Sequence, residues 1–158
     1  MDLRQNLTID GAYTLPSVDG TEGQVMKTDG AGNVSFSGQR EVIQLAVSDE
    51  TTALTTGTAK LTFRMPFAMT VTEVRASLST AGTTSGTTTI DINEGGTSIL
   101  STKLTIDATE KTSTTAATPA VISDSTLADD AEITIDIDAI SGGATEAGLK
   151  VTLIGNRA

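Results

Sequence analysis

The sequence contains no cysteine, no histidine and no tryptophan, and it has only one tyrosine, three phenylalanines and three prolines. Without cysteine, disulfides cannot stabilise the fold and a thiol nucleophile is excluded. Without histidine, the commonest general base is missing and a Ser–His–Asp triad is impossible. Glycoside hydrolysis needs only two carboxylates, and the chain has 20 Asp and Glu. Their spacing alone does not show that any two of them face each other across a cleft, so we expect no enzyme, with a small glycoside-processing enzyme as the remote alternative.

Positive charge is also scarce, because 10 Lys and Arg stand against 20 Asp and Glu, for a formal net charge of −10. Without a basic patch, a nucleic acid or an anionic membrane surface would be repelled. No apolar run approaches the roughly 20 residues of a membrane-spanning helix. Met1 is followed by Asp2 and Leu3 instead of a basic and apolar leader, so we expect no signal peptide.

Threonine, by contrast, is abundant, at about one residue in five. Together with isoleucine and valine it favours extended backbone, and the charged fraction of 19% is low for a disordered chain. Because aromatic side chains are few, the core must be a thin aliphatic layer, which favours two sheets packed face to face. We therefore expect an all-β protein, an antiparallel β-sandwich of jelly-roll type with a mostly extended N-terminal arm.

Residues 41–158 alternate short extended runs with turn clusters, which predicts a β-sandwich domain. The segments Glu132–Asp138 and Thr88–Asn93 alternate strictly, with isoleucine expected to face inward and polar side chains outward. One short helical turn could form within 107–115. The predicted strands cover 42–47, 59–65, 70–78, 87–93, 98–106 (which could be a single strand), 120–123, 131–137 and 149–154.

Residues 1–40 form the predicted arm, which is rich in Gly and Asp and has widely spaced apolar clusters. The turn sequence Asp29–Asn33 predicts a small hairpin between Val25–Lys27 and Asn33–Phe36. An isolated hairpin is marginal in water, so the arm needs a partner surface, either the following domain or another chain. The candidate docking residues are Leu7, Ile9, Tyr13, Leu15, Val25, Met26 and Phe36.

Calcium is the most plausible ligand for a chain without His or Cys, because it takes oxygen ligands. Asp91, Asn93 and Glu94 crowd one strand end and are the candidate ligands, although no EF-hand spacing is present. Asp91 and Asn93 also fit as outward, solvated strand residues, as do Asp136 and Asp138, and this interpretation is favoured. We accordingly expect no metal and no cofactor.

Phe63, Met65 and Phe67 alternate along one predicted strand and its end. They are candidates for a subunit interface or for the core, and the core is favoured because buried aromatics are more often interior. Subunit association would be a natural supplement for a chain that buries limited apolar area.

Two regions of the chain resemble bacteriophage proteins. The stretch Tyr13–Phe36, with its LP, DG, GQV and TDGAGN elements, resembles a module of phage fibre and virion-surface proteins that precedes a distal domain. Residues 42–155 resemble small β-sandwich domains of marine tailed phages. The segments that carry this second resemblance are Phe63–Phe67, Val71–Leu78, Ile90–Glu94, Ser98–Asp107 and Asp129–Asp136.

The resemblance implies a virion component, commonly a homotrimer, that is made in the bacterial cytoplasm and lies on the capsid surface or in a fibre. The first hypothesis is a capsid decoration (cement) or head-fibre subunit that binds the major capsid protein or other virion proteins through the arm. The chain has no repeats or heptads with which to build a long shaft. The alternative is a receptor-binding tip of a tail fibre, whose loops at 81–86 and 141–147 would contact a host glycan or protein.

Overall fold

The computed structural model describes residues 7–143 and 145–158. They divide into two compact units, of which the first ends at Arg40 and also includes Arg157. The second runs from Glu41 to Asn156 and also includes Ala158. We call them the N-terminal unit and the body, and describe each by itself.

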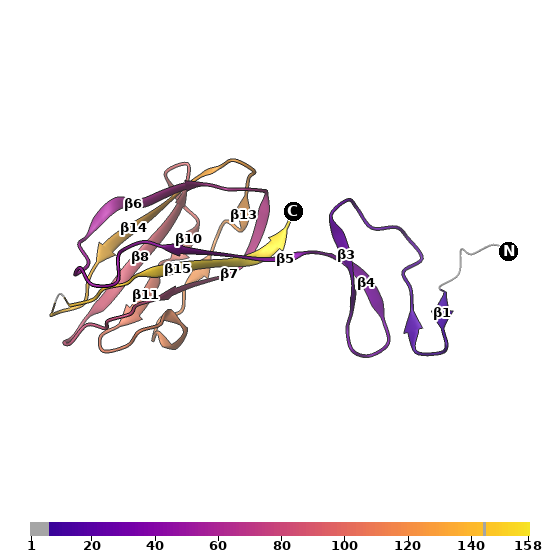
Figure 1. The fold of residues 1–158 in the computed structure, drawn as a ribbon, viewed down its shortest axis with the longest axis horizontal. Helices are drawn as coiled ribbons and strands as arrows, with labels where there is room; N and C mark the ends of the chain where they lie inside the picture. The colour runs from indigo at the N-terminus through magenta and orange to yellow at the C-terminus, as the bar shows by residue number, and fades with distance from the viewer. Residues whose placement is uncertain (1–6, 144) are drawn as a thin grey trace. The chain divides into compact units, whose positions relative to one another are not determined.

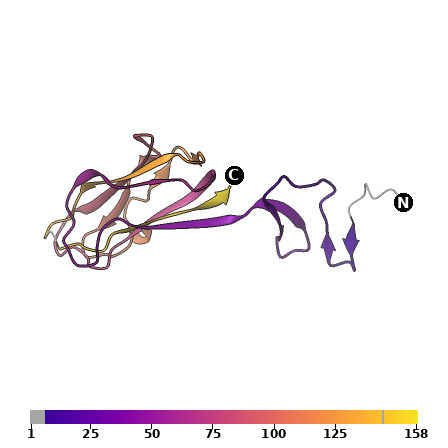
Figure 2. The same ribbon diagram turned by 45° about the horizontal axis from the view of Figure 1, so that its top comes forward.

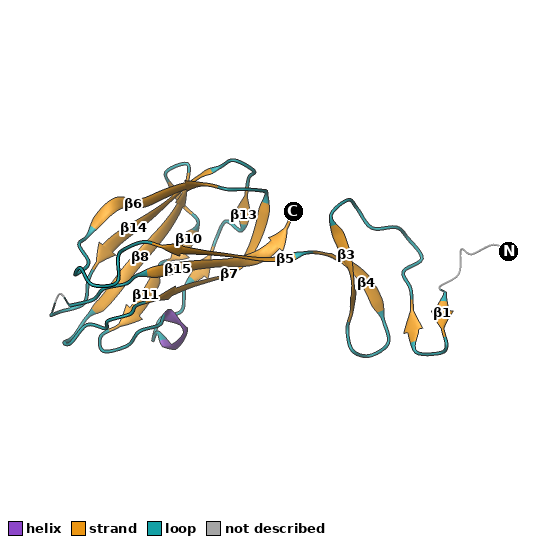
Figure 3. Cartoon of the chain, viewed as in Figure 1, coloured by secondary structure: helices purple, strands orange, loops and turns teal. Residues whose placement is uncertain are grey.

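The described chain is all-β and its strands form antiparallel sheets, as the composition predicts. Its single helical element is a 3₁₀ turn, η1 (Ser113–Thr115), which lies within the range where a short turn was expected (Figure 3). Thr112 caps this turn, because its hydroxyl accepts the N–H of Thr114 at 3.2 Å.

The body contains two larger sheets (Figures 1 and 2). The first sheet has the order β11-β8-β14-β6, with the short β9 paired to β8, and the second has the order β13-β7-β15-β5. The strands of the first sheet are β6 (Gly57–Arg64), β8 (Thr87–Glu94), β9 (Thr97–Ser98), β11 (Leu104–Asp107) and β14 (Glu132–Ala139). Those of the second are β5 (Arg40–Ala46), β7 (Met69–Ser77), β13 (Thr126–Leu127) and β15 (Lys150–Arg157). A separate pair is formed by β10 (Leu100–Thr102) and β12 (Val121–Ile122).

One aliphatic core receives side chains from both sheets. The predicted alternation is confirmed in β14, where Ile133, Ile135 and Ile137 are at most 1% exposed, and in β8, where Ile90 and Ile92 are fully buried. Strands β7 and β15 supply the facing residues, among them Met69, Val71, Val151 and Leu153. Burying such side chains is the main favourable contribution to folding in a chain with so few aromatics.

The prediction that 98–106 could be one strand is wrong, because this segment forms three short strands. Ile99 turns into the core at 1% exposure, and its carbonyl oxygen accepts the N–H groups of Ser123 and Asp124 at 2.9 and 3.1 Å. The N–H of Ile99 still donates to the carbonyl of Ile92 in β8 at 2.9 Å, and the chain then leaves β8 and pairs with it again from Leu104 onward.

The N-terminal unit consists of two hairpins. The predicted hairpin is confirmed as β3 (Gln24–Thr28) paired with β4 (Val34–Gly38). A second, unpredicted hairpin joins β1 (Thr8–Ile9) to β2 (Tyr13–Thr14).

Candidate assembly surface and polar clusters

The β1–β2 ribbon has two chemically different faces. Ile9 pairs with Tyr13 across the ribbon, and the N–H of Leu15 donates to the carbonyl of Leu7 at 2.9 Å. Because side chains alternate along a strand, these four lie on one face, while the Thr8 and Thr14 pair lies on the other. Leu7, Ile9 and Tyr13 are 50%, 50% and 49% exposed. One face of the ribbon is therefore apolar, and the described residues of its unit leave it largely exposed.

The turn that closes this ribbon carries a signal that sequence analysis missed. Asp10 and Gly11 adopt left-handed backbone with φ of 49° and 68°, and the N–H of Ala12 donates to the carbonyl of Ile9 at 2.9 Å. Asp-Gly between extended residues is a strong hairpin signal. The flanking strands are too short for periodicity to reveal them.

The β3–β4 hairpin is organised by its turn and by one aromatic side chain. The Asp29 carboxylate accepts the side-chain N–H of Asn33 at 2.7 Å and the backbone N–H of Ala31 at 2.7 Å. These bonds, with that of Asn33 the largest cause, lower the pKa of Asp29. The ring of Phe36 lies against Gly20, where an added Cβ would come within 2.7 Å of the ring.

In the described part of the N-terminal unit up to Arg40, no residue is buried. Val25 and Met26 are 43% and 60% exposed, whereas Leu15 and Phe36 are half-buried. The described residues of this unit thus form backbone hydrogen bonds but no hydrophobic core. Of the seven predicted docking residues, five present exposed apolar surface here: Leu7, Ile9, Tyr13, Val25 and Met26.

The candidate interface residues Phe63, Met65 and Phe67 lie in the body. Met65 is 2% exposed and belongs to the core, and Phe63 and Phe67 are partly buried against it. Packing in the core of a single chain therefore explains the burial of all three side chains. Their contribution to a subunit interface stays a prediction.

The candidate calcium ligands are not brought together. By strand alternation, Asp91 and Asn93 face away from the core, while Glu94 faces the other way and accepts the N–H of Ala128 at 2.9 Å. In the described parts of the chain, no three His, Cys, Asp or Glu side chains gather closely enough to hold a metal ion.

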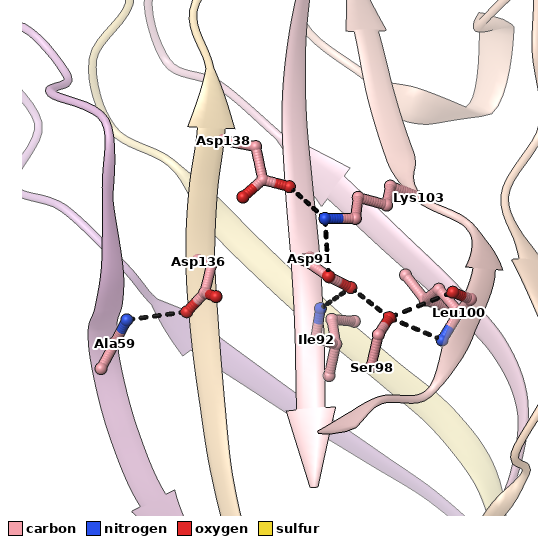
Figure 4. A network of polar contacts seen from close by, with 8 residues as sticks. All are labelled: Ala59, Asp91, Ile92, Ser98, Leu100, Lys103, Asp136 and Asp138. Atoms are coloured by element: carbon pink, nitrogen blue, oxygen red, sulfur yellow. Dashed lines mark hydrogen bonds and ion pairs between the residues drawn. The ribbon is translucent and has the colours of Figure 1, made fainter. Parts of the chain in front are cut away.

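The expectation that Asp91 and Asn93 are solvated is wrong, since they are 4% and 7% exposed. Figure 4 shows the reason for Asp91: Ser98 and Lys103, from the segment that follows β8, reach over it. Its Oδ1 accepts the Ser98 hydroxyl at 2.6 Å and the N–H of Ile92 at 2.9 Å. Its Oδ2 lies 2.9 Å from the Lys103 ammonium.

Lys103 is the cation of this outer-face cluster. Its ammonium also lies 2.6 Å from Asp138, and the two carboxylates, Asp138 first, raise the pKa of Lys103. Asp136, which pairs directly with Asp91 across β14 and β8, instead accepts the N–H of Ala59 at 2.7 Å (Figure 4). Every group in the cluster is thus engaged by its neighbours, which is typical of a structural network.

An open groove of about 470 Å³ runs beside β7. Its lining combines apolar side chains such as Val74, Leu104 and Val121 with hydroxyl groups and the exposed Glu73–Arg75 ion pair. Glu73 is the only carboxylate among the described lining residues. The groove therefore lacks the pair of carboxylates that glycoside hydrolysis requires.

The two loops predicted to contact a receptor lie together at one end of the body. The N–H of Thr84 donates to the carbonyl of Gly142 at 3.2 Å, and the N–H of Gly142 donates to the carbonyl of Ser85 at 2.9 Å. The hydroxyl of Thr145 donates to the carbonyl of Ala81 at 3.2 Å. The described residues of 81–86 and 141–147 thus form one bonded surface.

No protein-family model, no curated protein and no solved structure matches this chain. In the described part of the chain, no helix has the length and apolar character needed to cross a membrane. The function proposed below therefore rests on the chain's own residues.

Proposed function

We propose that this chain is a non-enzymatic structural protein of a tailed-phage virion, a capsid decoration or head-fibre subunit that attaches through its N-terminal arm, residues 1–40. The observation that carries the proposal is the apolar face of the β1–β2 ribbon, in a unit whose described residues include no buried side chain up to Arg40. A two-stranded ribbon is marginal in water, and an exposed apolar face rimmed by polar residues marks an interaction site.

Burial in an assembly supplies what the N-terminal unit lacks. Leu7, Ile9 and Tyr13 are each about half exposed, so covering them contributes on the order of 1 kcal/mol apiece. Binding of this kind stabilises both the capsid and the ribbon, because the apolar face of the ribbon and the capsid surface that it covers are buried only in the assembled particle. The partner is the major capsid protein or another virion protein.

For the body we propose a jelly-roll sandwich, and the strand order supports it. When the strands are numbered along the chain from β5, without β9, β10 and β12, the first sheet read from β6 has the order 2-7-4-5. The second sheet read from β5 has the order 1-8-3-6. This is the order in which two interlocked Greek keys pair their eight strands. Jelly rolls are frequent in viral capsid proteins, which supports a virion role by analogy of fold alone.

We further propose that the subunits form homotrimers on the virion surface, as the resemblance of residues 42–155 implies. The net charge of −10 disfavours close approach of the acidic bodies. Apolar contacts between the subunits, outside the ribbon face that attaches to the particle, would have to offset that repulsion. Sedimentation equilibrium of the full chain tests this point, and a monomer at all concentrations would contradict it.

The attachment role is tested by paired substitutions on the two faces of the ribbon. We expect Ile9→Asp to weaken binding to purified capsids that lack this protein by at least about tenfold, because it places a charge on the apolar face. Thr8→Asp, one residue away on the opposite face, is the matched control and should bind within about threefold of the unmodified chain. Equal binding by the Ile9→Asp variant would rule out attachment through this face.

The second candidate function, a receptor-binding tip of a tail fibre, is favoured by one observation. The loops at 81–86 and 141–147 are bonded into one surface, as expected of recognition loops held by a rigid scaffold. If this function is the correct one, purified protein should compete with phage adsorption to host cells. A capsid-attached subunit without receptor contacts should not compete.

A further inference from the structure

A fully buried carboxylate lies where the loops at 81–86 and 141–147 meet. Glu146 is 0% exposed, and its Oε1 accepts hydrogen bonds from the hydroxyls of Thr88, at 3.0 Å, and of Ser141. Its Oε2 is also buried and has no hydrogen-bond partner among the described residues. Among the described residues, Oε1 therefore accepts two hydrogen bonds and Oε2 accepts none.

This carboxyl group has no counter-ion among the described residues. In the described chain, no Lys or Arg lies within ion-pair distance of Glu146, and the nearest cation along the sequence, Lys150, pairs with Glu50. A buried charge is costly unless it is paired or binds a metal ion. Glu146 differs in this respect from Asp91, the other buried acid, whose counter-ion is Lys103.

The surroundings of Glu146 offer oxygen atoms and exclude bulky side chains. A Cβ on Gly82 would lie 2.0 Å from the Ser141 hydroxyl and 2.7 Å from Oε1 of Glu146. A Cβ on Gly143 would lie 2.2 Å from the Thr83 hydroxyl. The two loops thus pack closely, with the hydroxyls of Ser141 and Thr83 lying against glycines where any larger residue would clash.

We propose that Glu146 is the anionic ligand of a small metal cation held between these two loops. Hard cations such as Na⁺ and Ca²⁺ bind carboxylate, hydroxyl and carbonyl oxygens together with water. The cation binds Oε2, for which no described residue provides a partner, and its other ligands are neutral oxygens. One carboxylate balances one positive charge, so charge balance favours a monovalent ion. The bound ion fixes the two loops to each other, and this role is independent of the proposed virion function.

Thermal unfolding of the full-length protein in different salts tests the site. Protein freed of divalent ions with a chelator is compared in choline chloride, NaCl and CaCl₂ at equal ionic strength, which holds general screening constant. We expect Tm to be about 5 °C or more higher in NaCl or in CaCl₂ than in choline chloride. Which of the two salts acts identifies the ion. Equal Tm values in all three salts would overturn the proposal.

Two variants separate a specific site from cation binding to the acidic surface. Glu146→Gln keeps the shape but removes the charge, so it should lose the salt-specific rise in Tm. Glu94→Gln is the matched control and should keep it. An unchanged salt response in Glu146→Gln would also overturn the proposal.

If Glu146→Gln does not fold, crystal structures of the unmodified protein give the second readout. Crystals grown in NaCl and in CaCl₂ should show an ion beside Oε2 in at least one salt, at about 2.4 Å if the ion is calcium. Only water, or nothing, beside Oε2 in both salts would rule the site out.

Discussion

Lys103 lies between the carboxylates of Asp91 and Asp138 on the outer face of the first sheet, and it is the counter-ion of the buried Asp91. Asp91 is 4% exposed and pairs across the strands with Asp136, and like charges directly opposite each other destabilise a sheet. The Lys103 ammonium, 2.9 Å from Asp91, offsets this repulsion. The side chain of Lys103 is 43% exposed, so solvent screens part of the interaction.

We expect Lys103→Met to lower the free energy of unfolding by about 2 kcal/mol, because it leaves Asp91 buried without a cation. The loss is smaller than for a fully enclosed ion pair, since water reaches the lysine. Urea unfolding at pH 7 measures it. Lys111→Met is the control and should change stability by less than about 0.5 kcal/mol. Equal stability of the two variants would contradict the role assigned to Lys103.

Asp49 gives a pH-dependent contribution that can be assigned to one turn. Its carboxylate accepts the N–H groups of Thr52 at 2.7 Å and Thr51 at 2.8 Å. These bonds, that of Thr52 first, lower the pKa of Asp49 from 3.8 to about 2. Because the pKa is lower in the folded state, the stabilisation is fully present above pH 3.8 and is lost as the pH falls through 2.

We therefore expect the stability difference between the unmodified chain and Asp49→Ala to be constant from pH 7 down to about pH 4 and to shrink towards pH 2. Urea unfolding at several pH values measures it, and an NMR titration of the Asp49 carboxyl should give a midpoint near 2. A midpoint at the ordinary value of 3.8 would show that the turn does not bind the ionised form preferentially.

The backbone hydrogen bonds of the β1–β2 and β3–β4 hairpins are covered by fewer buried side chains than those of the body strands. The body strands β8 and β14 lie over fully buried isoleucines. The two hairpins have no buried side chain over their described residues. Opening them costs little apolar contact.

We expect the amide hydrogens of the two hairpins to exchange with solvent within seconds in dilute protein, while those of β8 and β14 exchange far more slowly. Hydrogen exchange followed by mass spectrometry measures both in one sample. Addition of capsids should slow exchange in the hairpins and leave the body strands unchanged. Hairpins that are as protected as β8 in an isolated monomer would contradict the view that they need a partner.

The sequence predicted those elements whose side-chain pattern is set locally. Strict alternation located β8 and β14, and the Asp29–Asn33 turn located the β3–β4 hairpin. The break at Ile99 was not predictable, because it depends on the distant residues that bond its carbonyl. The burial of Asp91 was missed for the same reason, since Lys103 covers it only after the chain has turned. The hydrogen bond from Thr88 to Glu146 could not be predicted either, because it joins residues far apart in the sequence.

The charge and the apolar surface of the whole molecule suit the proposed assembly role. A net charge of −10 makes copies of the chain repel one another at a distance. The apolar ribbon face supplies a short-range attraction at one place. A protein of this kind is expected to bind a surface through one contact and to present its body outward.

Electron cryo-microscopy of the intact virion shows directly whether the chain is attached through its ribbon. We expect density for the body on the outside of the particle, with the apolar face of Leu7, Ile9, Tyr13 and Leu15 buried against another protein chain. A virion that lacks this chain, or one that holds it through the body while this ribbon face remains in solvent, would contradict it.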